Sequence, residues 1–438
     1  MARFTFNGGI HPYEGKELSK DKPMREYLPK GELVYPVSQH IGAPAKIIVN
    51  KGDRVLVGQK IAEAGGFVSA PIFATVSGTV KAIDKHRVPV GDMVDSVIVE
   101  NDGLYEEVEF IQPKPLAELS HDEIIKIISD AGIVGMGGAG FPTHVKLSPK
   151  EPEKIEYLIA NCSECEPYLT SDYRRMIEEP EKLINGMKVE MALFPKAKAI
   201  FAIEDNKPDC IEIMTKLTKD EPNMEVAALK TKYPQGAERA IIYAVTGRAI
   251  NSSMLPADAG CIVNNVDTLC AIGRAVFEGR PLMERIVTVT GDAINDPVNF
   301  IVRCGTNYAE LIEAAGGFKT EPEKVISGGP MMGFALFDLN VPVTKTSSAL
   351  LCLTKDAVSA NEPSACINCG KCAQVCPERL LPMKLATFGA NGNEEMFIKY
   401  HGLECVECGC CSYACPAKRH VTQNIKTMRK IALSHKKK

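Results

Sequence analysis

The sequence predicts a multidomain α/β protein that begins with an all-β module and ends with a small cysteine-rich domain. Three observations support this class. Short β-rich runs and turn signals fill residues 33–103. Strand-like and helix-like runs then alternate between residues 104 and 280, which is the pattern of an α/β sheet. One spacing of four cysteines occurs twice after residue 356.

Composition limits the broad class of the protein. The chain has 438 residues, of which 45% are hydrophobic and 24% charged, and its formal net charge is −4. These values indicate about three globular domains and do not suggest nucleic-acid binding. No window of about 18 apolar residues is present, and the first residues lack the apolar core of a signal peptide. We therefore expect a cytoplasmic chain without a transmembrane segment, whose 16 cysteines stay reduced.

The N-terminal third is expected to contain an arm and a β module. Residues 1–32 are rich in charge, Gly and Pro, and we expect an extended arm that packs on another part of the chain. Residues 33–103 contain strand-like runs such as Ala45–Val49 and Gly78–Ile83. Their Lys-Gly-Asp-x-Val and Ser-Gly-Thr-Val phrases resemble a biotinyl/lipoyl-type barrel-sandwich, but the lysine that would carry a prosthetic group is missing. A docking or structural role is therefore expected.

An α/β domain is predicted over residues 104–280. It opens with a capping box, in which Ser120 and Glu123 can satisfy each other's backbone amides, and the helix that follows should stop at Gly132. The expected strands are Ile155–Ala160, Lys198–Ile203, Met224–Leu229 and Cys261–Asn265, and the expected helices lie near 171–188, 208–218, 235–246 and 267–277.

A smaller unit and a connector are predicted over residues 281–355. The unit contains a strand at Arg285–Gly291, a helix at Thr306–Ala315 and a second strand at Lys324–Gly329. Residues Val341–Leu353 are expected to form a β connector into the last domain.

The C-terminal domain, residues 356–438, carries the most specific motif of the chain. The pattern Cys-x2-Cys-x2-Cys-x3-Cys-Pro begins once at Cys366 and again at Cys405. It is typical of ferredoxins with two [4Fe-4S] clusters, in which the fourth cysteine of each run ligates the other cluster. The pattern therefore indicates single-electron transfer. It assigns one cluster to Cys366, Cys369, Cys372 and Cys415, and the second to Cys405, Cys408, Cys411 and Cys376.

Zinc ribbons and disulfides are the alternative uses of closely spaced cysteines. A zinc ribbon has four ligands, whereas here two sets of three close cysteines each have a remote fourth cysteine followed by proline. Cys410 stands beside Cys411, but only Cys411 keeps the two-residue gap to Cys408. We expect Cys410 to pack in the core.

The loop Gly135–Gly140 contains the sequence G-x-G-x-x-G. A Rossmann dinucleotide fingerprint needs a strand before this sequence and a helix after it. Here a capped helix precedes the loop and Phe-Pro-Thr follows it, which argues against that fingerprint. A bare turn is the other interpretation of a loop so rich in glycine.

Three polar phrases follow predicted strands or begin predicted helices, where open α/β sheets bind ligands. They are Asn161–Pro167, Tyr233–Glu238 and Asn264–Thr268. Each phrase alone could be an exposed loop or a helix cap, but the phrases occur in order with the glycine loop. Together these four segments resemble the flavoprotein family that includes the NADH-oxidising subunit of respiratory complex I.

This resemblance implies binding of FMN, held non-covalently, and of NADH. In that family a GxGGAGFPTxxK loop holds the flavin, its backbone amides cradle the phosphate and its lysine adds charge. No residue is expected to act as a catalytic acid or base, and Glu166 and Glu238 are expected to orient the nicotinamide. The residues implied are Gly137, Gly138, Ala139, Gly140, Phe141 and Lys146 in the loop, Asn161, Glu164 and Glu166 near the flavin or nicotinamide, Tyr233, Gly236 and Glu238 on the nucleotide side, and Asn264, Asn265 and Thr268 at the polar edge or tail of the flavin. Ser163, Cys165, Ala237 and His144 depart from the residues typical of the family.

The whole order of domains resembles the C-subunit family of Rnf membrane complexes. In that family the unit before the cysteines is a β-grasp domain of the soluble-ligand-binding (SLBB) type. The resemblance implies a peripheral subunit on the cytoplasmic side of the cell membrane that exchanges hydride between NAD(H) and FMN and passes single electrons through both clusters. It further implies ferredoxin:NAD+ oxidoreduction coupled to Na+ or H+ translocation, with membrane and iron-sulfur subunits as partners and ferredoxin as an indirect one.

Two other functions remain open at this stage. A diaphorase-type subunit of a soluble hydrogenase or formate dehydrogenase would share the flavin phrases, but such relatives usually carry one three-cysteine motif with a distant fourth cysteine. An assembly subunit or a non-catalytic electron relay could keep the fold, although intact Lys146, Glu164 and Glu166 disfavour this. The related subunit of the sodium-pumping quinone reductase lacks the clusters, so the cysteines exclude it.

Overall fold

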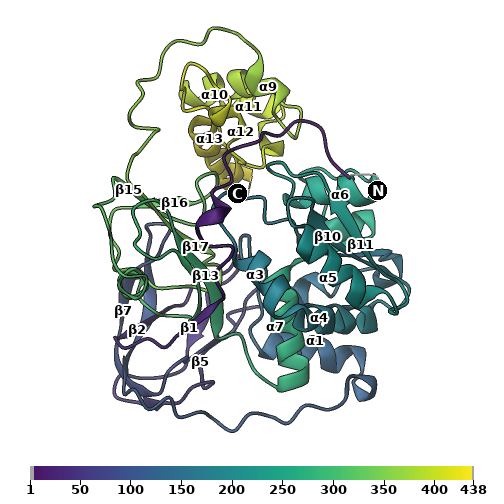
Figure 1. The fold of residues 1–438 in the computed structure, drawn as a ribbon, viewed down its shortest axis with the longest axis vertical. Coiled ribbons are helices and arrows are strands. Elements are labelled where there is room, and N and C mark those ends of the chain that lie inside the picture. Colours follow the sequence, from purple (N-terminus) through teal and green to yellow (C-terminus); the bar gives the residue numbers. More distant parts are fainter. Residues whose placement is uncertain (1–3, 437–438) are drawn as a thin grey trace.

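The computed structural model describes residues 4–436 and places their strands in four sheets. We name the parts the barrel domain (33–101), the α/β domain (116–278), the β-grasp domain (284–353) and the C-terminal domain (371–436). Figure 1 shows the α/β domain on one side, the two β-rich domains on the other, and the helical C-terminal domain above both.

The barrel domain consists of two antiparallel sheets. One contains β2 (Leu33–Pro36), β8 (Met93–Asn101), β7 (Gly78–Arg87) and β4 (Arg54–Val55), and the other contains β3 (Lys46–Ile47), β5 (Lys60–Glu63) and β6 (Ile72–Phe73). Apolar side chains from both sheets, including those of Leu33, Ile61 and Val80, are fully buried in a shared core. The strand predicted over Ala45–Val49 is limited to β3 (Lys46–Ile47), and the strand predicted over Gly78–Ile83 extends to Arg87 as β7.

The α/β domain contains one parallel sheet in the order β11-β10-β9-β12. Its strands are β9 (Tyr157–Cys162), β10 (Lys198–Glu204), β11 (Met224–Leu229) and β12 (Cys261–Asn265). The chain moves outward from β9 to β11 and then returns, so that β12 pairs with the free side of β9. Ligands of open α/β sheets bind beyond the carboxyl ends of strands at such a reversal.

Helices cover both sides of this sheet: α1 (His121–Asp130), α2 (Thr143–Lys146), α3 (Ser171–Glu178), α4 (Pro180–Leu193), α5 (Pro208–Thr218), α6 (Glu238–Thr246) and α7 (Val266–Glu278). The predicted capping box before α1 is confirmed, because the Glu123 carboxylate accepts from the Ser120 amide at 2.9 Å. The single helix predicted near 171–188 is wrong. Pro180, which has no amide hydrogen to donate, instead begins a second helix after a break at Glu179.

The β-grasp domain has a mixed six-stranded sheet in the order β1-β14-β13-β17-β15-β16. The strands are β1 (Arg25–Tyr27), β13 (Glu284–Thr290), β14 (Val298–Arg303), β15 (Lys324–Ser327), β16 (Phe334–Leu336) and β17 (Ala349–Leu353), and α8 (Tyr308–Ala314) packs on the sheet. Only the last part of the predicted connector Val341–Leu353 is a strand, namely β17.

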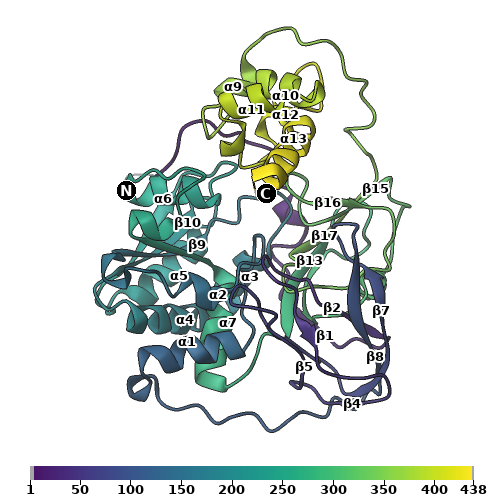
Figure 2. The same cartoon turned by 180° about the vertical axis from the view of Figure 1, so that it is seen from behind.

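The N-terminal arm supplies β1, which pairs in parallel with β14. Before β1 the arm runs past three domains (Figure 2). The Phe4 amide donates to the Ala228 carbonyl of β11, and the Gly9 amide donates to the Val375 carbonyl of the C-terminal domain at 2.9 Å. Residues 1–3 of the predicted arm lie outside the described residues.

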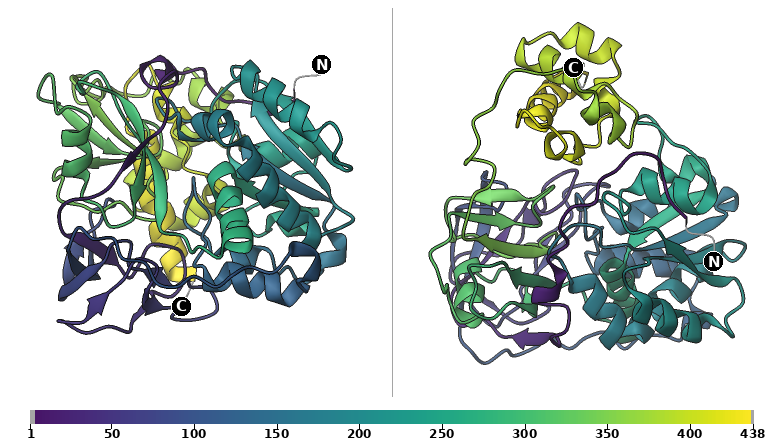
Figure 3. Two further views of the ribbon diagram at one scale, coloured as in Figure 1. Left: turned by 60° about the horizontal axis from the view of Figure 1, so that its bottom comes forward. Right: turned by 45° about the horizontal axis from the view of Figure 1, so that its top comes forward.

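The C-terminal domain is made of short helices around a small core. Its helices are α9 (Lys371–Gln374), α10 (Pro382–Ala390), α11 (Glu394–Lys399), α12 (Cys410–Tyr413) and α13 (Val421–Lys436). A long segment after β17 leads to it, and the domain lies above the junction of the α/β and β-grasp domains (Figure 3). Among residues 4–436, none of the helices combines the length and the apolar character needed to cross a bilayer.

A buried group of three charges joins the α/β domain to the β-grasp domain. Asp267 of α7 lies 3.0 Å from Nη2 of Arg175 in α3, and it also contacts the guanidinium group of Arg285 in β13. All three residues are at most 6% exposed. Burial alone would raise the pKa of Asp267, but the guanidinium groups of Arg285 and Arg175 hold it below its usual range. The carboxylate is therefore charged and fixes the relative position of three elements.

Replacing Asp267 by Asn should leave the buried Arg285 guanidinium without its counter-ion, while Arg175 keeps only its ion pair with Glu179. We expect the free energy of unfolding to fall by about 3–5 kcal/mol, because an uncompensated buried charge is costly. Urea unfolding followed by circular dichroism measures this change. Asp130→Asn is the matched control, since Asp130 forms an exposed pair with Lys126 on α1 and its loss should cost less than about 1 kcal/mol. Equal losses in both variants would contradict the prediction.

Candidate functional site

At the carboxyl edge of the parallel sheet, where β9 and β12 end, the phrases Asn161–Pro167 and Asn264–Thr268 lie next to the phrase before α6, Tyr233–Glu238. Asn161 lies within β9, and its Nδ2 donates to the Gly236 carbonyl at 2.8 Å. Asn264 and Asn265 end β12, which pairs with β9. The phrase Tyr233–Glu238, which leads into α6, therefore lies against the end of β9.

The glycine loop is attached to the same edge through α7. The Met136 amide donates to Thr268 Oγ1 at 2.9 Å, and an added Cβ at Gly137 would lie 3.1 Å from Asn265 Nδ2. At Gly138 an added Cβ would meet no atom within 4 Å. The middle of the loop is thus open, and a phosphate could approach its backbone amides closely.

Lys146 extends from α2 toward the edge of β12. Its Nζ donates to the Val263 carbonyl at 2.7 Å and lies 3.8 Å from a carboxylate oxygen of Glu238, the first residue of α6. The structure therefore brings together the predicted residues Lys146 and Glu238 with the end of β12.

Several buried polar atoms near this edge have no hydrogen-bond partner among residues 4–436. They include Ser163 Oγ, Asn264 Oδ1 and both side-chain polar atoms of Gln235, a residue that is 0% exposed. Buried polar groups in native proteins are nearly always hydrogen-bonded to protein, water or ligand. The unpartnered polar atoms at this edge therefore fit a polar ligand, such as a flavin with its ribityl and phosphate groups.

Glu164 lies under the start of α3 instead of facing the open edge. Its carboxylate accepts from the Asp172 amide at 2.7 Å and the Tyr173 amide at 3.3 Å, and Lys16 of the arm lies 3.7 Å away. Asp172 in turn accepts from Asn265 Nδ2 at 2.7 Å. Glu164 can therefore influence the site through Asp172 and Asn265.

Glu166 and Tyr233 lie at the junction of three domains. Glu166 accepts from the Met331 amide at 2.7 Å, in the loop between β15 and β16, and burial raises its pKa to about 7. An added Cβ at Gly329 would lie 2.2 Å from Glu166, so this loop can approach only because residue 329 is glycine. The Tyr233 hydroxyl donates to the Cys408 carbonyl at 2.8 Å.

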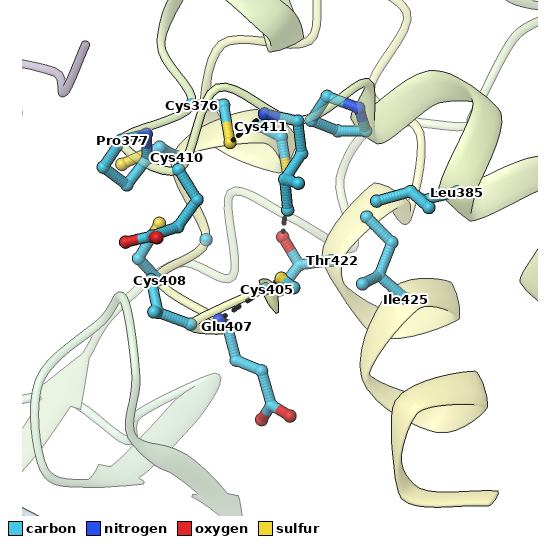
Figure 4. A pocket seen from close by; sticks show the side chains of 15 residues that line it. Cys376, Pro377, Leu385, Cys405, Glu407, Cys408, Cys410, Cys411, Thr422 and Ile425 are labelled. Atoms are coloured by element: carbon cyan, nitrogen blue, oxygen red, sulfur yellow. Dashed lines mark hydrogen bonds between the residues drawn. The ribbon is translucent and has the colours of Figure 1, made fainter. Parts of the chain in front are cut away.

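The eight cysteines of the repeated motif line two pockets in the C-terminal domain. Figure 4 shows the first of them, the inner cysteine pocket. The second is the outer cysteine pocket. In each pocket the fourth cysteine of one run joins the first three of the other run. The inner pocket is lined by Cys376, Cys405, Cys408 and Cys411, and the outer by Cys366, Cys369, Cys372 and Cys415.

The two pockets differ in their surroundings. Cys408 and Cys411 of the inner pocket are buried, and the Tyr233 hydroxyl attaches this pocket to the α/β domain. Cys366 and Cys369 of the outer pocket are exposed. The inner pocket therefore faces the α/β domain, and the outer pocket faces solvent.

The thiols surround a space in each pocket and do not converge on one point. Within residues 4–436, no three His, Cys, Asp or Glu side chains are arranged to hold a single metal ion. Four thiolates around a space form the ligand set of an iron-sulfur cubane. Cys410 also borders the inner pocket, but its Sγ lies 3.9 Å from the Tyr233 carbonyl, toward the α/β domain.

Sequence reasoning missed Glu190, which supports the site from α4. The Asn264 amide group donates to its carboxylate at 2.5 Å, and burial raises the pKa of Glu190 to about 7. A signal was available, because Glu190 stands among the apolar residues Met187, Val189, Met191 and Leu193, just beyond the helix predicted near 171–188. Lys16 and Asp172 gave no such signal, since each stands in a polar segment.

Replacing Glu190 by Gln should make the pH dependence of stability flatter. A carboxyl pKa raised in the folded state means that the native protein binds more protons than the unfolded chain between about pH 4.5 and 7, so its stability falls as pH rises through that window. We expect Glu190→Gln to match the wild type at pH 5 and to gain up to about 3 kcal/mol at pH 8. Urea unfolding at both pH values measures this. A constant difference between the two proteins would contradict the prediction.

Four family models match successive parts of the chain. They are the RnfC barrel sandwich hybrid domain over residues 4–104, the Nuo51 FMN-binding domain over 128–274, the SLBB domain over 286–335 and the 4Fe-4S dicluster domain over 365–418. These matches confirm the predicted fold class. A crystal structure of an NAD+-reducing [NiFe]-hydrogenase in the H2-reduced state is similar in fold, with a TM-score of 0.52 and 20% identity over 74% of this chain and 62% of that chain.

Related proteins match almost the full length of the chain. The C subunit of the proton-translocating ferredoxin:NAD(+) oxidoreductase complex of Clostridium ljungdahlii is 47% identical over 97% of this chain and 93% of its own length. The C subunit of the Na(+)-translocating ferredoxin:NAD(+) oxidoreductase complex of Acetobacterium woodii is 44% identical over 99% of this chain and 98% of its own length. The chain therefore belongs to the family of C subunits of ion-translocating ferredoxin:NAD+ oxidoreductase (Rnf) complexes, as the order of its domains predicted.

Proposed function

We propose that the chain binds FMN at the carboxyl edge of its parallel sheet, oxidises or reduces NAD(H) there, and passes single electrons through two [4Fe-4S] clusters. One observation carries the proposal. Tyr233 belongs to the polar phrase before α6, and its hydroxyl donates to Cys408 of the inner cysteine pocket at 2.8 Å. The proposed flavin edge and the proposed cluster ligands are thus attached to each other by one side chain.

The glycine loop and the ends of β9 and β12 would hold the FMN. In this proposal the amides of Gly137, Gly138, Ala139 and Gly140 bind the phosphate. Lys146 adds a positive charge near it. Asn161, Asn264, Asn265 and Thr268 supply polar contacts at the flavin. Unpartnered Asn264 Oδ1 and the open space at Gly138 support this placement.

The residues around the edge would position the substrate and exclude water. A bound flavin exchanges a hydride with nicotinamide and releases electrons singly to an iron-sulfur cluster. Glu166 and Glu238 are proposed to orient the nicotinamide, with Phe141 and Gly236 lining the nucleotide side. Glu164 acts indirectly in this scheme, because it holds the start of α3 and so positions Asp172 against Asn265.

The two cysteine pockets would act in sequence. The inner pocket, with Cys376, Cys405, Cys408 and Cys411, is the one attached to the α/β domain. The outer pocket, with Cys366, Cys369, Cys372 and Cys415, has exposed thiols. We therefore propose that electrons pass between the flavin and the outer cluster through the inner cluster.

The names of the relatives supply the context of the complex. Both near-full-length relatives are C subunits of ferredoxin:NAD(+) oxidoreductase complexes, one proton-translocating and the other Na(+)-translocating. We propose that this chain is likewise a peripheral subunit on the cytoplasmic face of the membrane, which meets the membrane and iron-sulfur subunits of such a complex and receives electrons from ferredoxin indirectly. Ion translocation would take place in other subunits.

Anaerobic purification of the full chain tests the cofactor assignment. We expect about eight irons and one FMN per chain, and we expect NADH to bleach both the flavin and the cluster absorption bands. Iron and sulfide assays, flavin release and anaerobic absorption spectra provide the measurements. A protein with full iron but no flavin, which NADH does not bleach, would be an electron relay and would contradict the proposal.

The neighbouring residues Cys410 and Cys411 allow a matched test of the inner cluster. We expect Cys411→Ser to lose about four irons per chain and Cys410→Ser to keep about eight, because only Cys411 is proposed as a ligand. In Cys411→Ser, NADH should still bleach the flavin but should leave the outer cluster oxidised. Iron analysis and electron paramagnetic resonance after NADH addition measure both effects. Reduction of the outer cluster in that variant would contradict the proposed order.

A further inference from the structure

We propose that the Thr422 hydroxyl raises the reduction potential of the inner cluster, because it donates a hydrogen bond to the sulfur of the ligand Cys411. The proposal rests on the two clusters proposed above and deepens their role in electron transfer. It assigns a function to a side chain outside the cysteine motif. It also makes the two clusters unequal, although one repeated motif builds both.

Thr422 borders the inner cysteine pocket from the start of α13. Its Oγ1 lies 3.3 Å from Cys411 Sγ, within hydrogen-bond reach of a sulfur atom. Figure 4 shows the hydroxyl directed toward the cysteines, from the helix that also carries Ile425. The side chain is therefore placed to act on the inner pocket.

Neighbouring hydrogen bonds fix the Thr422 hydroxyl as a donor to the sulfur. The Ser412 hydroxyl donates to Thr422 Oγ1 at 2.9 Å, and the Thr422 amide donates to Ser412 Oγ at 2.9 Å. A cysteine that ligates iron is a thiolate and has no hydrogen of its own. Only Thr422 can therefore supply the hydrogen of the bond to Cys411. The proton stays on the Thr422 oxygen in both oxidation states of the cluster.

The first cysteine run offers a matched comparison. Met383 of α10 stands eleven residues after Cys372, the spacing that also separates Thr422 from Cys411. Met383 borders the outer pocket, and its Sδ lies 3.9 Å from Cys372 Sγ. A thioether has no hydrogen to donate. The same place in the repeat thus carries a donor beside the inner cluster and a non-donor beside the outer cluster.

The helices after the two cysteine runs begin at the same place in the repeat. They start one residue before the compared position, at Pro382 in α10 and at Val421 in α13. The partial positive charge of a helix N-terminus therefore acts on both pockets in a similar way. Ala373 stands where the second run has Ser412, so the second run adds a pair of hydroxyl groups.

Two backbone amides act in the same direction as the hydroxyl. Leu380 donates to Cys376 Sγ and Glu407 donates to Cys405 Sγ, each at 3.4 Å. Thr422 differs from these donors because its hydrogen belongs to a side chain. A substitution of Thr422 can therefore remove one bond to the inner ligands and leave both amides in place.

The hydroxyl opposes the effect of burial on the inner cluster. Reduction adds one negative charge to a cluster, and burial disfavours a charge. Cys408 and Cys411 are each 8% exposed, whereas Cys366 and Cys369 are exposed, so burial alone would make the inner cluster the harder one to reduce. A hydrogen bond to a ligand sulfur favours the reduced state. Thr422 therefore brings the potential of the inner cluster back toward that of the outer cluster.

Redox titration of the full, cluster-loaded chain tests the proposal. Thr422→Val keeps the shape of the side chain and the amide bond to Ser412, but it removes the hydroxyl. We expect the ratio of reduced to oxidised inner cluster at a fixed potential to fall about 3- to 10-fold, the range that one hydrogen bond produces. The midpoint potential then falls by about 30–60 mV, at 59 mV per tenfold change. Electron paramagnetic resonance at set potentials measures both clusters.

Three further variants serve as controls. Thr422→Ser keeps the hydroxyl and should keep the inner potential. Met383→Leu changes the equivalent position beside the outer cluster without removing a donor, and it should also leave the inner potential unchanged. Cys411→Ser, which we expect to lack the inner cluster, identifies the signal that belongs to it. The outer potential should be the same in Thr422→Val and in the wild type.

The outcomes separate this proposal from the function on which it rests. An unchanged inner potential in Thr422→Val would overturn the proposal, and so would an equal fall in Thr422→Ser, which keeps the hydroxyl. Loss of about four irons from Thr422→Val would assign the hydroxyl to cluster retention and overturn its effect on the potential. In each of these cases a wild type with about eight irons leaves the proposed function standing. If the wild type binds no clusters, the proposed function fails and this proposal fails with it.

Discussion

Tyr233 attaches the α/β domain to the C-terminal domain, and the proposed path of electrons depends on that attachment. Its backbone pairs with Ile10 of the arm in both directions, at 2.8 and 2.9 Å, while its hydroxyl holds the Cys408 carbonyl. Beside it, Glu166 holds the Met331 loop of the β-grasp domain. One small region therefore fixes where the flavin edge, the β-grasp loop and the inner cysteine pocket meet.

Other domain contacts in this chain also rely on buried polar groups. Lys345 donates to the Pro71 carbonyl at 2.6 Å and to the Gly132 carbonyl at 2.7 Å, which joins the β-grasp, barrel and α/β domains. Burial lowers the pKa of Lys345 to about 8. Buried charges of this kind, like Asp267 with its two arginines, contribute little net stability, but their hydrogen bonds are satisfied in only one arrangement. Such contacts suit a protein whose cofactor sites must keep fixed separations.

Local patterns allowed much of this architecture to be predicted from the sequence. The strand Met224–Leu229 and the helix 208–218 have the bounds that were predicted for them. Strand β1 could not be predicted, because its partner β14 is far away in the sequence. The contacts of Glu164 were equally hidden, since a loop carboxylate that caps a helix and one that faces a ligand have the same local sequence.

The path of the N-terminal arm has a consequence for biosynthesis. The arm is made before the C-terminal domain, yet its Gly9 amide donates to the Val375 carbonyl, and an added Cβ at Gly8 would lie 2.8 Å from the Cys376 carbonyl oxygen. Domains generally fold in the order in which they leave the ribosome. The arm therefore cannot complete its contacts until Val375 and Cys376 have been translated. The arm is therefore among the last parts of the described chain to settle.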